Sequence, residues 1–141
     1  MNDQIIDKVV TAAYEARSLS YAPYSDFKMG AAILTDKDKI ISGSLVENVS
    51  LGLAMCAERI ALFSSVSQDA GKPLILVLVS ERTDGKITFP CGACLQVALE
   101  LGGPKLEIIA SDLSKNIERN KIIDLALRLP HKTNKLYNLD D

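Results

Sequence analysis

The sequence predicts an α/β fold in which a mixed β-sheet lies between layers of helices. Three observations support this prediction: an amphipathic helical pattern near the first residue, short apolar runs typical of strands, and the order in which the two kinds of segment alternate. The expected order is helix, strand, strand, helix, strand, helix, strand, helix. A chain that interleaves strands and helices in this way tends to bury a mixed sheet between helices.

The first expected element is a helix that begins at Asn2 or Asp3 and ends near Ser18. Apolar pairs recur every four residues along it, which gives the helix one apolar stripe, and Asn2 or Asp3 can cap its first turn. Residues 20–26 contain proline and small polar residues without periodicity, so they predict an ordered loop.

Apolar runs predict four strands after this loop. Residues 29–34 and 40–42 flank the polar residues 35–39, a pattern that predicts an antiparallel hairpin. Residues 74–79 are continuously apolar, which is typical of a central strand covered on both faces. Residues 106–110 have the same character and predict a second buried strand.

Three further helices complete the expected pattern, at residues 56–66, 92–101 and 122–127. A chain of 141 residues fits one domain, and neither an internal repeat nor a flexible linker divides it. We therefore expect a single domain over residues 1–141, with a polar C-terminal tail from about residue 131.

The composition limits the partners of the protein. With 48% apolar residues and 24% charged residues the chain is typical of a globular protein, and its apolar share favours an oligomer. Sixteen basic against eighteen acidic residues give a net charge of −2, so no strong positive field attracts nucleic acid. Neither a secretion signal nor an apolar stretch of ~18 residues is present, so we expect a cytoplasmic protein without a membrane partner.

All three cysteines fall at the starts of two predicted helices: Cys56 in one, Cys91 and Cys94 in the other. In a Cys-x-x-Cys at a helix start, both sulfurs face the same way and the helix dipole favours the thiolate that binds metal. Taken alone, the pair at 91 and 94 fits equally a structural zinc site, a redox pair or small buried residues. Three converging thiolates would be one ligand short of a closed tetrahedral zinc site, which is the catalytic pattern.

Glu58 is the candidate proton carrier for such a site. It follows Cys56 by two residues, on the first turn of the same predicted helix. A zinc ion lowers the pKa of a bound water from 15.7 toward about 7, and a nearby carboxylate can accept the proton as a general base. Without the spacing from Cys56, Glu58 would be an ordinary solvated residue that the helix dipole favours.

These motifs resemble those of a known family. Cys-Ala-Glu at 56–58 followed by Pro-Cys-Gly-Ala-Cys at 90–94 matches the zinc deaminase signature H-x-E…P-C-x-x-C in a three-cysteine form. Residues 21–32 and 47–59 extend the likeness. The chain resembles the small, homotetrameric cytidine deaminases over roughly residues 5–130.

The resemblance implies a fold, an assembly and a reaction. The fold is a three-layer α/β/α sandwich around a five-stranded mixed sheet, and the assembly is a homotetramer whose active sites share residues between subunits. The reaction is the zinc-dependent hydrolytic deamination of cytidine or deoxycytidine in nucleoside salvage. Cys56, Cys91 and Cys94 would hold Zn²⁺, and Glu58 would move the protons.

The resemblance also implies three contacts with the nucleoside. Phe27 would pack against it, Glu47 would bind a ribose hydroxyl, and the backbone of Ala57 would contact the base. Read from the residues alone, Glu47 could instead be a surface carboxylate and Phe27 ordinary core. Charge counting adds Arg59: three thiolates on Zn²⁺ leave a net charge of −1, which a guanidinium bonded to a ligand sulfur would offset.

At four positions the chain departs from the family pattern. Leu45 stands where the family has an asparagine that binds the ribose, and an unpaired hydroxyl there costs ~1–3 kcal/mol. Leu51 replaces a common tyrosine, Leu95 an arginine and Thr133 a phenylalanine. With the catalytic motifs intact, these changes favour deamination with a shifted substrate preference.

Three functional hypotheses therefore stay open from the sequence. The first is a deaminase of cytidine or deoxycytidine. The second is the same mechanism on a modified cytosine nucleoside or a nucleoside antibiotic similar to blasticidin S, which Leu45 favours. The third is a zinc-stabilised oligomeric module without catalysis, which Glu58 argues against because a structural site needs no carboxylate at that position.

Overall fold

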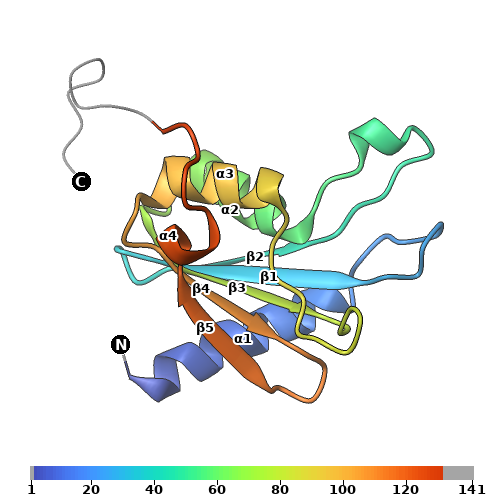
Figure 1. Ribbon diagram of the computed structural model, residues 1–141, viewed down its shortest axis with the longest axis horizontal. Coiled ribbons are helices and arrows are strands. Elements are labelled where there is room, and N and C mark those ends of the chain that lie inside the picture. The colour runs from blue at the N-terminus through green and yellow to red at the C-terminus, as the bar shows by residue number, and fades with distance from the viewer. Residues whose placement is uncertain (1, 132–141) are drawn as a thin grey trace.

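The computed structural model describes residues 2–131; residues 132–141, which include Thr133 and almost all of the predicted tail, lie outside the described residues. The elements along the chain are α1 (Asp3–Arg17), β1 (Met29–Thr35), β2 (Ile40–Ser44), the 3-10 helix η1 (Leu51–Leu53), α2 (Ala57–Ser67), β3 (Pro73–Ser80), α3 (Gly92–Gly102), β4 (Glu107–Ser111), β5 (Ile117–Lys121) and α4 (Ile122–Leu125). They form three layers, with α1 below the sheet and the other α-helices above it (Figure 1).

The sheet is mixed and five-stranded, in the order β2-β1-β3-β4-β5. Strands β3 and β4 run parallel, and the other neighbours run antiparallel. The predicted hairpin is confirmed, with Ala32 opposite Ser42 in the β1–β2 ladder. The apolar run at 74–79 lies in β3, between β1 and β4, and is almost fully buried, so the prediction of a central strand is confirmed.

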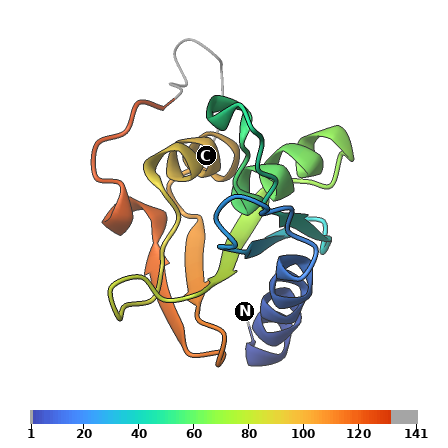
Figure 2. The same ribbon diagram turned by 90° about the vertical axis from the view of Figure 1, so that its right-hand side faces the viewer.

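Helix α1 covers one face of the sheet alone, as the side view shows (Figure 2). The side chain of Asn2 accepts a hydrogen bond from the backbone N–H of Ile5 at 2.9 Å, so Asn2, one of the two predicted residues, is the N-cap, and Ser18 is the C-cap. The apolar stripe of α1 packs on the sheet in a core cluster that includes Ile6, Val9, Val10, Ala13, Leu34, Ile75, Val77 and Ile109.

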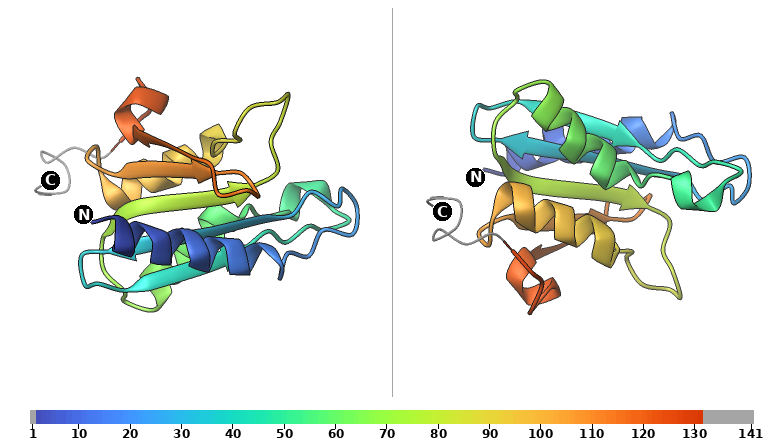
Figure 3. Two further views of the ribbon diagram at one scale, coloured as in Figure 1. Left: turned by 90° about the horizontal axis from the view of Figure 1, so that it is seen from below. Right: turned by 90° about the horizontal axis from the view of Figure 1, so that it is seen from above.

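Helices α2 and α3 lie side by side on the opposite face (Figure 3). Their buried side chains form a second core cluster with the sheet that includes Ala61, Leu62, Leu95, Ala98, Leu99, Ile33, Leu76 and Ile108. At Gly43 of β2, a Cβ atom would lie 2.5 Å from the carbonyl oxygen of Ala57. The missing side chain therefore lets the first turn of α2 rest directly on β2.

One strand and one short helix were not expected from the residue pattern. Strand β5 pairs with β4 from Glu107↔Lys121 to Ser111↔Ile117, and gives the sheet the fifth strand that the family resemblance implies. The 3-10 helix η1 lies between β2 and α2. The last helix, α4, ends at Leu125 rather than at residue 127. Within residues 2–131, every helix is too short or too polar to cross a lipid bilayer.

Candidate metal centre and active site

Two helix starts meet at one end of the molecule. Cys56 is the N-cap of α2 and Cys91 is the N-cap of α3, and neither side chain makes a capping hydrogen bond. Both helices begin at the end of the sheet from which the loops before β1 and α2 project (Figure 1). The sulfur atoms therefore lie among backbone N–H groups that favour negative charge.

The structure brings the three cysteine sulfurs together. The Sγ atoms of Cys56, Cys91 and Cys94 all lie within 4.8 Å of one another, and those of Cys91 and Cys94 are 3.6 Å apart. Two thiolates bound at about 2.3 Å to one tetrahedral zinc ion would have sulfurs about 3.8 Å apart. The donor set and its spacing thus fit a zinc ion with three protein ligands.

The pKa values of the cysteine thiols favour the binding of a cation. A hydrogen bond from Cys94, followed by the guanidinium of Arg59, lowers the pKa of Cys56 to about 5. The same hydrogen bond with Cys56, together with burial, raises the pKa of Cys94. Three sulfurs this close cannot all ionise without a positive charge between them, and a bound cation replaces the shared proton.

Arg59 lies beside the first of these sulfurs. Its Nη2 atom donates to Sγ of Cys56 at 3.4 Å, and this hydrogen bond is the main cause that raises the pKa of Arg59. Its Nε atom is buried and has no acceptor among the described residues. The structure therefore puts the guanidinium where the charge argument expects it, while its effect on a metal stays a prediction.

Glu58 is buried on the first turn of α2. The residue is 1% exposed, and its Oε1 atom has no hydrogen-bond partner among residues 2–131. Burial raises the pKa of Glu58 to about 7, helped by the nearby charge of Cys56. The alternative of a solvated first-turn residue is wrong, because this carboxyl faces the protein interior with a free acceptor atom.

A short backbone ladder joins two more segments to the start of α2. Val46 pairs in parallel with Tyr21 and antiparallel with Met55, the residue before Cys56. The backbone N–H of Glu47 donates to the carbonyl of Tyr21 at 2.8 Å. The loop before β1 (blue) and the segment before α2 (teal) accordingly lie side by side (Figures 1 and 2).

The three predicted substrate contacts lie in these segments and in α2. Ala57 is fully buried, while Phe27 and Glu47 are half-buried. The carboxylate of Glu47 accepts hydrogen bonds from the backbone N–H groups of Tyr24 and Ser25 and from the Ser25 hydroxyl. Ser25 was not among the predicted site residues, because nothing in the residue pattern separates it from other small polar loop residues.

The departures from the family pattern fall in different environments. Leu45 is 8% exposed, next to the ladder, and Leu95 is 8% exposed within the core cluster under α2 and α3. Leu51 on η1 is 79% exposed. An apolar residue at position 95 thus adds to the core, whereas the one at position 51 faces outward.

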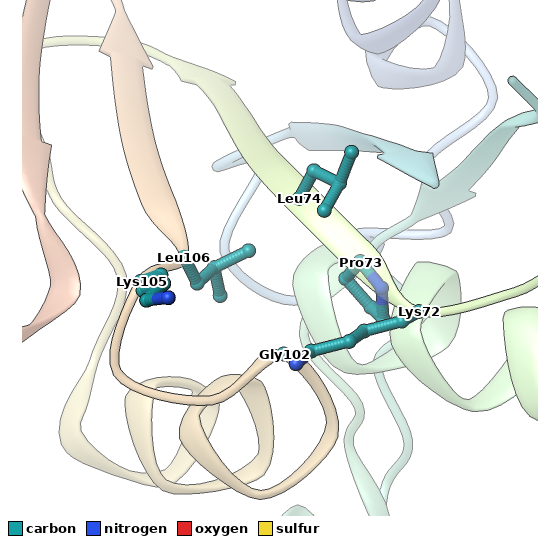
Figure 4. A pocket seen from close by; sticks show the side chains of 6 residues that line it. All are labelled: Lys72, Pro73, Leu74, Gly102, Lys105 and Leu106. Atoms are coloured by element: carbon teal, nitrogen blue, oxygen red, sulfur yellow. The ribbon is translucent and has the colours of Figure 1, made fainter. Parts of the chain in front are cut away.

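A hollow lies at the far end of α3, away from the sulfur cluster (Figure 4). It has a volume of about 240 Å³ and is lined by Lys72, Pro73, Leu74, Gly102, Lys105 and Leu106. The 11 residues of α3 separate it from the sulfur cluster by roughly 15 Å. It contains neither a thiol nor a carboxyl group, so it is not part of the candidate metal centre.

Known proteins are similar to this chain in sequence and fold. The profile of the cytidine and deoxycytidylate deaminase zinc-binding region matches residues 3–110. The crystal structure of cytidine deaminase from Burkholderia pseudomallei is similar, with a TM-score of 0.79 and 40% identity over 89% of this chain and 96% of that one. The crystal structure of cytidine deaminase from Mycobacterium tuberculosis has a TM-score of 0.73 and is 35% identical over 89% of this chain and 94% of that one. Cytidine deaminase from Sporosarcina psychrophila is 33% identical over 120 residues, 85% of this chain and 87% of that one.

Proposed function

The chain belongs to the cytidine and deoxycytidylate deaminase family, and on that premise we propose that it is a zinc-dependent hydrolase that converts cytidine or deoxycytidine to uridine or deoxyuridine and ammonia. The observation that carries the proposal is the buried carboxyl of Glu58, two residues after one of three converging cysteines, with an oxygen that has no hydrogen-bond partner within residues 2–131. A purely structural zinc site needs no such group, so the non-catalytic module is disfavoured.

Cys56, Cys91 and Cys94 are the proposed zinc ligands. The spacing of their sulfurs and the lowered pKa of Cys56 support this assignment. A zinc ion held there supplies the Lewis acidity that makes a water molecule nucleophilic at neutral pH. Arg59 and the N-termini of α2 and α3 offset the net charge of −1 that three thiolates leave.

Glu58 is the proposed proton carrier. Its carboxylate takes a proton from the attacking water and delivers it to N3 of cytosine as the C4–O bond forms. It then takes the second proton of that water from the new C4 hydroxyl and passes it to the amino group, which leaves as ammonia when the C4–N bond breaks and the C4=O bond forms. A pKa of about 7 allows one carboxyl to serve as base and then as acid near neutral pH.

The remaining contacts hold the nucleoside. We assign the backbone of Ala57 to the base, the ring of Phe27 to packing against the nucleoside, and Glu47 to a sugar hydroxyl. The ladder that pairs Val46 with Met55 supports this placement, because it keeps Glu47 close to the start of α2.

A second candidate substrate is a modified cytosine nucleoside, which Leu45 favours. This side chain is apolar and 8% exposed, so it offers no hydrogen bond to a sugar hydroxyl. We expect Leu45→Asn to lower the KM for cytidine by about 5-fold or more if ribose is the sugar bound here, since a regained hydrogen bond is worth ~1 kcal/mol. An unchanged or raised KM would favour the modified nucleoside.

We further propose a homotetramer that acts in the cytoplasm, without a nucleic acid or membrane partner. Exposed apolar side chains on and beside α2 support an oligomer; they are Val49, Leu51, Leu53, Phe63 and Val66. The free cysteines support a reducing compartment. The net charge of −2 argues against a polyanionic partner.

The test is a panel of cytosine nucleosides and bases, with ammonia release and the ultraviolet spectrum as readouts. We expect turnover of cytidine or deoxycytidine, a loss of about 10²–10⁴ in kcat for Glu58→Gln, and wild-type turnover for the exposed control Glu100→Gln. Activity that survives in Glu58→Gln would reject the mechanism. A protein that binds one zinc per chain and acts on no substrate would favour the non-catalytic module.

A further inference from the structure

The carboxylate of Glu47 holds the loop before β1 with three hydrogen bonds. Its Oε1 atom accepts from the backbone N–H of Tyr24 at 3.0 Å and from that of Ser25 at 3.3 Å, and its Oε2 atom accepts from the Ser25 hydroxyl at 2.6 Å. The bond from Ser25 is the largest cause that lowers the pKa of Glu47. The group is therefore an ionised anchor for this loop.

The hydroxyl of Ser25 connects this anchor to Phe27. While its hydrogen points to Glu47, its oxygen accepts a hydrogen bond from the backbone N–H of Phe27 at 3.0 Å. The turn between them is tight: Asp26 has a positive φ of 55°, and its N–H donates to the carbonyl of Ala22 at 3.0 Å. The position of Phe27 thus depends on a chain of two hydrogen bonds that ends on Glu47.

Both ends of this chain are proposed substrate contacts. The ladder ties Glu47 to Tyr21 on one side and, through Val46, to Met55 and the start of α2 on the other. A shift of the loop would therefore move the ring of Phe27 relative to the metal centre while α2 stayed in place. If Ser25 only closed an ordinary turn, its hydroxyl would not connect two residues that are both proposed substrate contacts.

The three bonds also limit what Glu47 can do for a substrate. A carboxylate offers about four lone-pair sites. Tyr24 and Ser25 use three of these sites. The remaining lone-pair site is on Oε2, the oxygen that accepts from the Ser25 hydroxyl. Glu47 can thus accept one substrate hydroxyl without releasing the loop, and the Ser25 hydroxyl determines which direction that free site faces.

We propose that Ser25 is a positioning residue for nucleoside binding, whose hydroxyl links Glu47 to the backbone of Phe27 and thereby sets both substrate contacts at once. The proposal rests on the proposed function, because the nucleoside is the ligand that these two residues hold. Ser25 itself touches neither the metal ligands nor Glu58 in the described contacts, so it acts on substrate binding rather than on the proton transfers.

The kinetic test compares Ser25→Ala with Ser25→Thr, which keeps the hydroxyl at an exposed position. We expect Ser25→Ala to raise the KM for cytidine about 10-fold with kcat within about 2-fold of wild type, because binding is weakened and chemistry is not. Ser25→Thr should restore most of the affinity. The control is Ser67→Ala, which removes a serine hydrogen bond at the end of α2 and should leave KM unchanged.

A KM at the wild-type level in Ser25→Ala would overturn the proposal, and so would a Ser25→Thr protein that behaves like Ser25→Ala. Amide hydrogen exchange gives a readout without substrate. We expect the Phe27 amide to exchange about 10-fold faster in Ser25→Ala than in wild type, and equal rates would overturn the link. If the wild-type protein deaminates no nucleoside, the proposed function fails, and the exchange rates alone decide whether Ser25 holds the loop.

Discussion

The Nη2 atom of Arg59 lies 3.4 Å from the Sγ atom of Cys56, less than one turn away on α2. A permanent cation therefore faces the first of the three sulfurs, and part of it is shielded from solvent. Since the two residues are three positions apart at the start of one helix, their side chains lie on the same face of α2.

Arg59→Ala should weaken zinc binding about 10–100-fold and lower turnover, because groups that contact metal ligands from outside have effects of this size. Arg59→Lys should retain part of the affinity, since it keeps the charge but not the fork of N–H donors. Competition with a zinc chelator measures the affinity. Unchanged zinc affinity and turnover in Arg59→Ala would remove this residue from the site.

Removal of zinc should abolish turnover and lower the thermal midpoint by about 10 °C or more, because a ligand that binds only the folded state stabilises it by mass action. Zinc should restore both properties and magnesium neither, since thiolates are poor ligands for magnesium. Calorimetry and ammonia release on the same samples provide the measurement. Full activity after complete chelation would contradict a zinc-dependent reaction.

Gly43→Ala should destabilise the protein by about 1–3 kcal/mol, because the new methyl group would meet the backbone of α2 rather than a mobile side chain. Zinc affinity should fall in parallel, since the displaced turn carries Cys56 and Glu58. The matched control is Gly52→Ala on η1, where a Cβ atom has open space. Urea unfolding of both variants tests this, and equal stabilities would mean that β2 does not position α2.

Asp112 should make stability depend on acid pH. A hydrogen bond from the Asn116 side chain, backbone N–H donors and Arg82 at 2.9 Å lower the pKa of Asp112 to about 2, against about 3.9 in an unfolded chain. The folded state therefore gains stability from the ionised group above about pH 4, and loses it as pH falls toward 2.

Urea unfolding of wild type and Asp112→Asn at several pH values measures this effect. The difference in unfolding free energy should be constant above about pH 5 and shrink between about pH 4 and pH 2. Loss of zinc in acid affects both proteins, so it cancels in the difference. A difference that stays constant to pH 2 would contradict the assignment.

Residue patterns predicted the buried strands and the helices, but not β5. Its residues Ile117–Lys121 are mostly exposed and charged, so they lack the apolar alternation by which a strand is recognised. They form a strand because β4 offers unpaired backbone groups at the edge of the sheet. The pairing of β5 with β4 depends on tertiary structure rather than on the local residue pattern. Only the resemblance to the cytidine deaminases indicated the fifth strand.

The metal centre was easier to predict than the loop that holds the substrate. Cys56, Cys91 and Cys94 are fixed by spacing at helix starts, which a sequence displays directly. The bonds between Glu47 and Ser25 depend instead on a turn with a positive φ at Asp26, in a loop without periodicity. No local pattern specifies which acceptor such a hydroxyl will find.

Glu58 carries a consequence for engineering. An ionisable group kept out of solvent lowers stability relative to a well-matched apolar side chain, and the same burial raises the pKa of Glu58. The buried carboxyl is retained because the proposed reaction requires a proton carrier at this position. Glu58→Leu should accordingly melt at a higher temperature than the active protein while deaminating nothing, so a library screened for heat resistance alone would accumulate inert variants at this position.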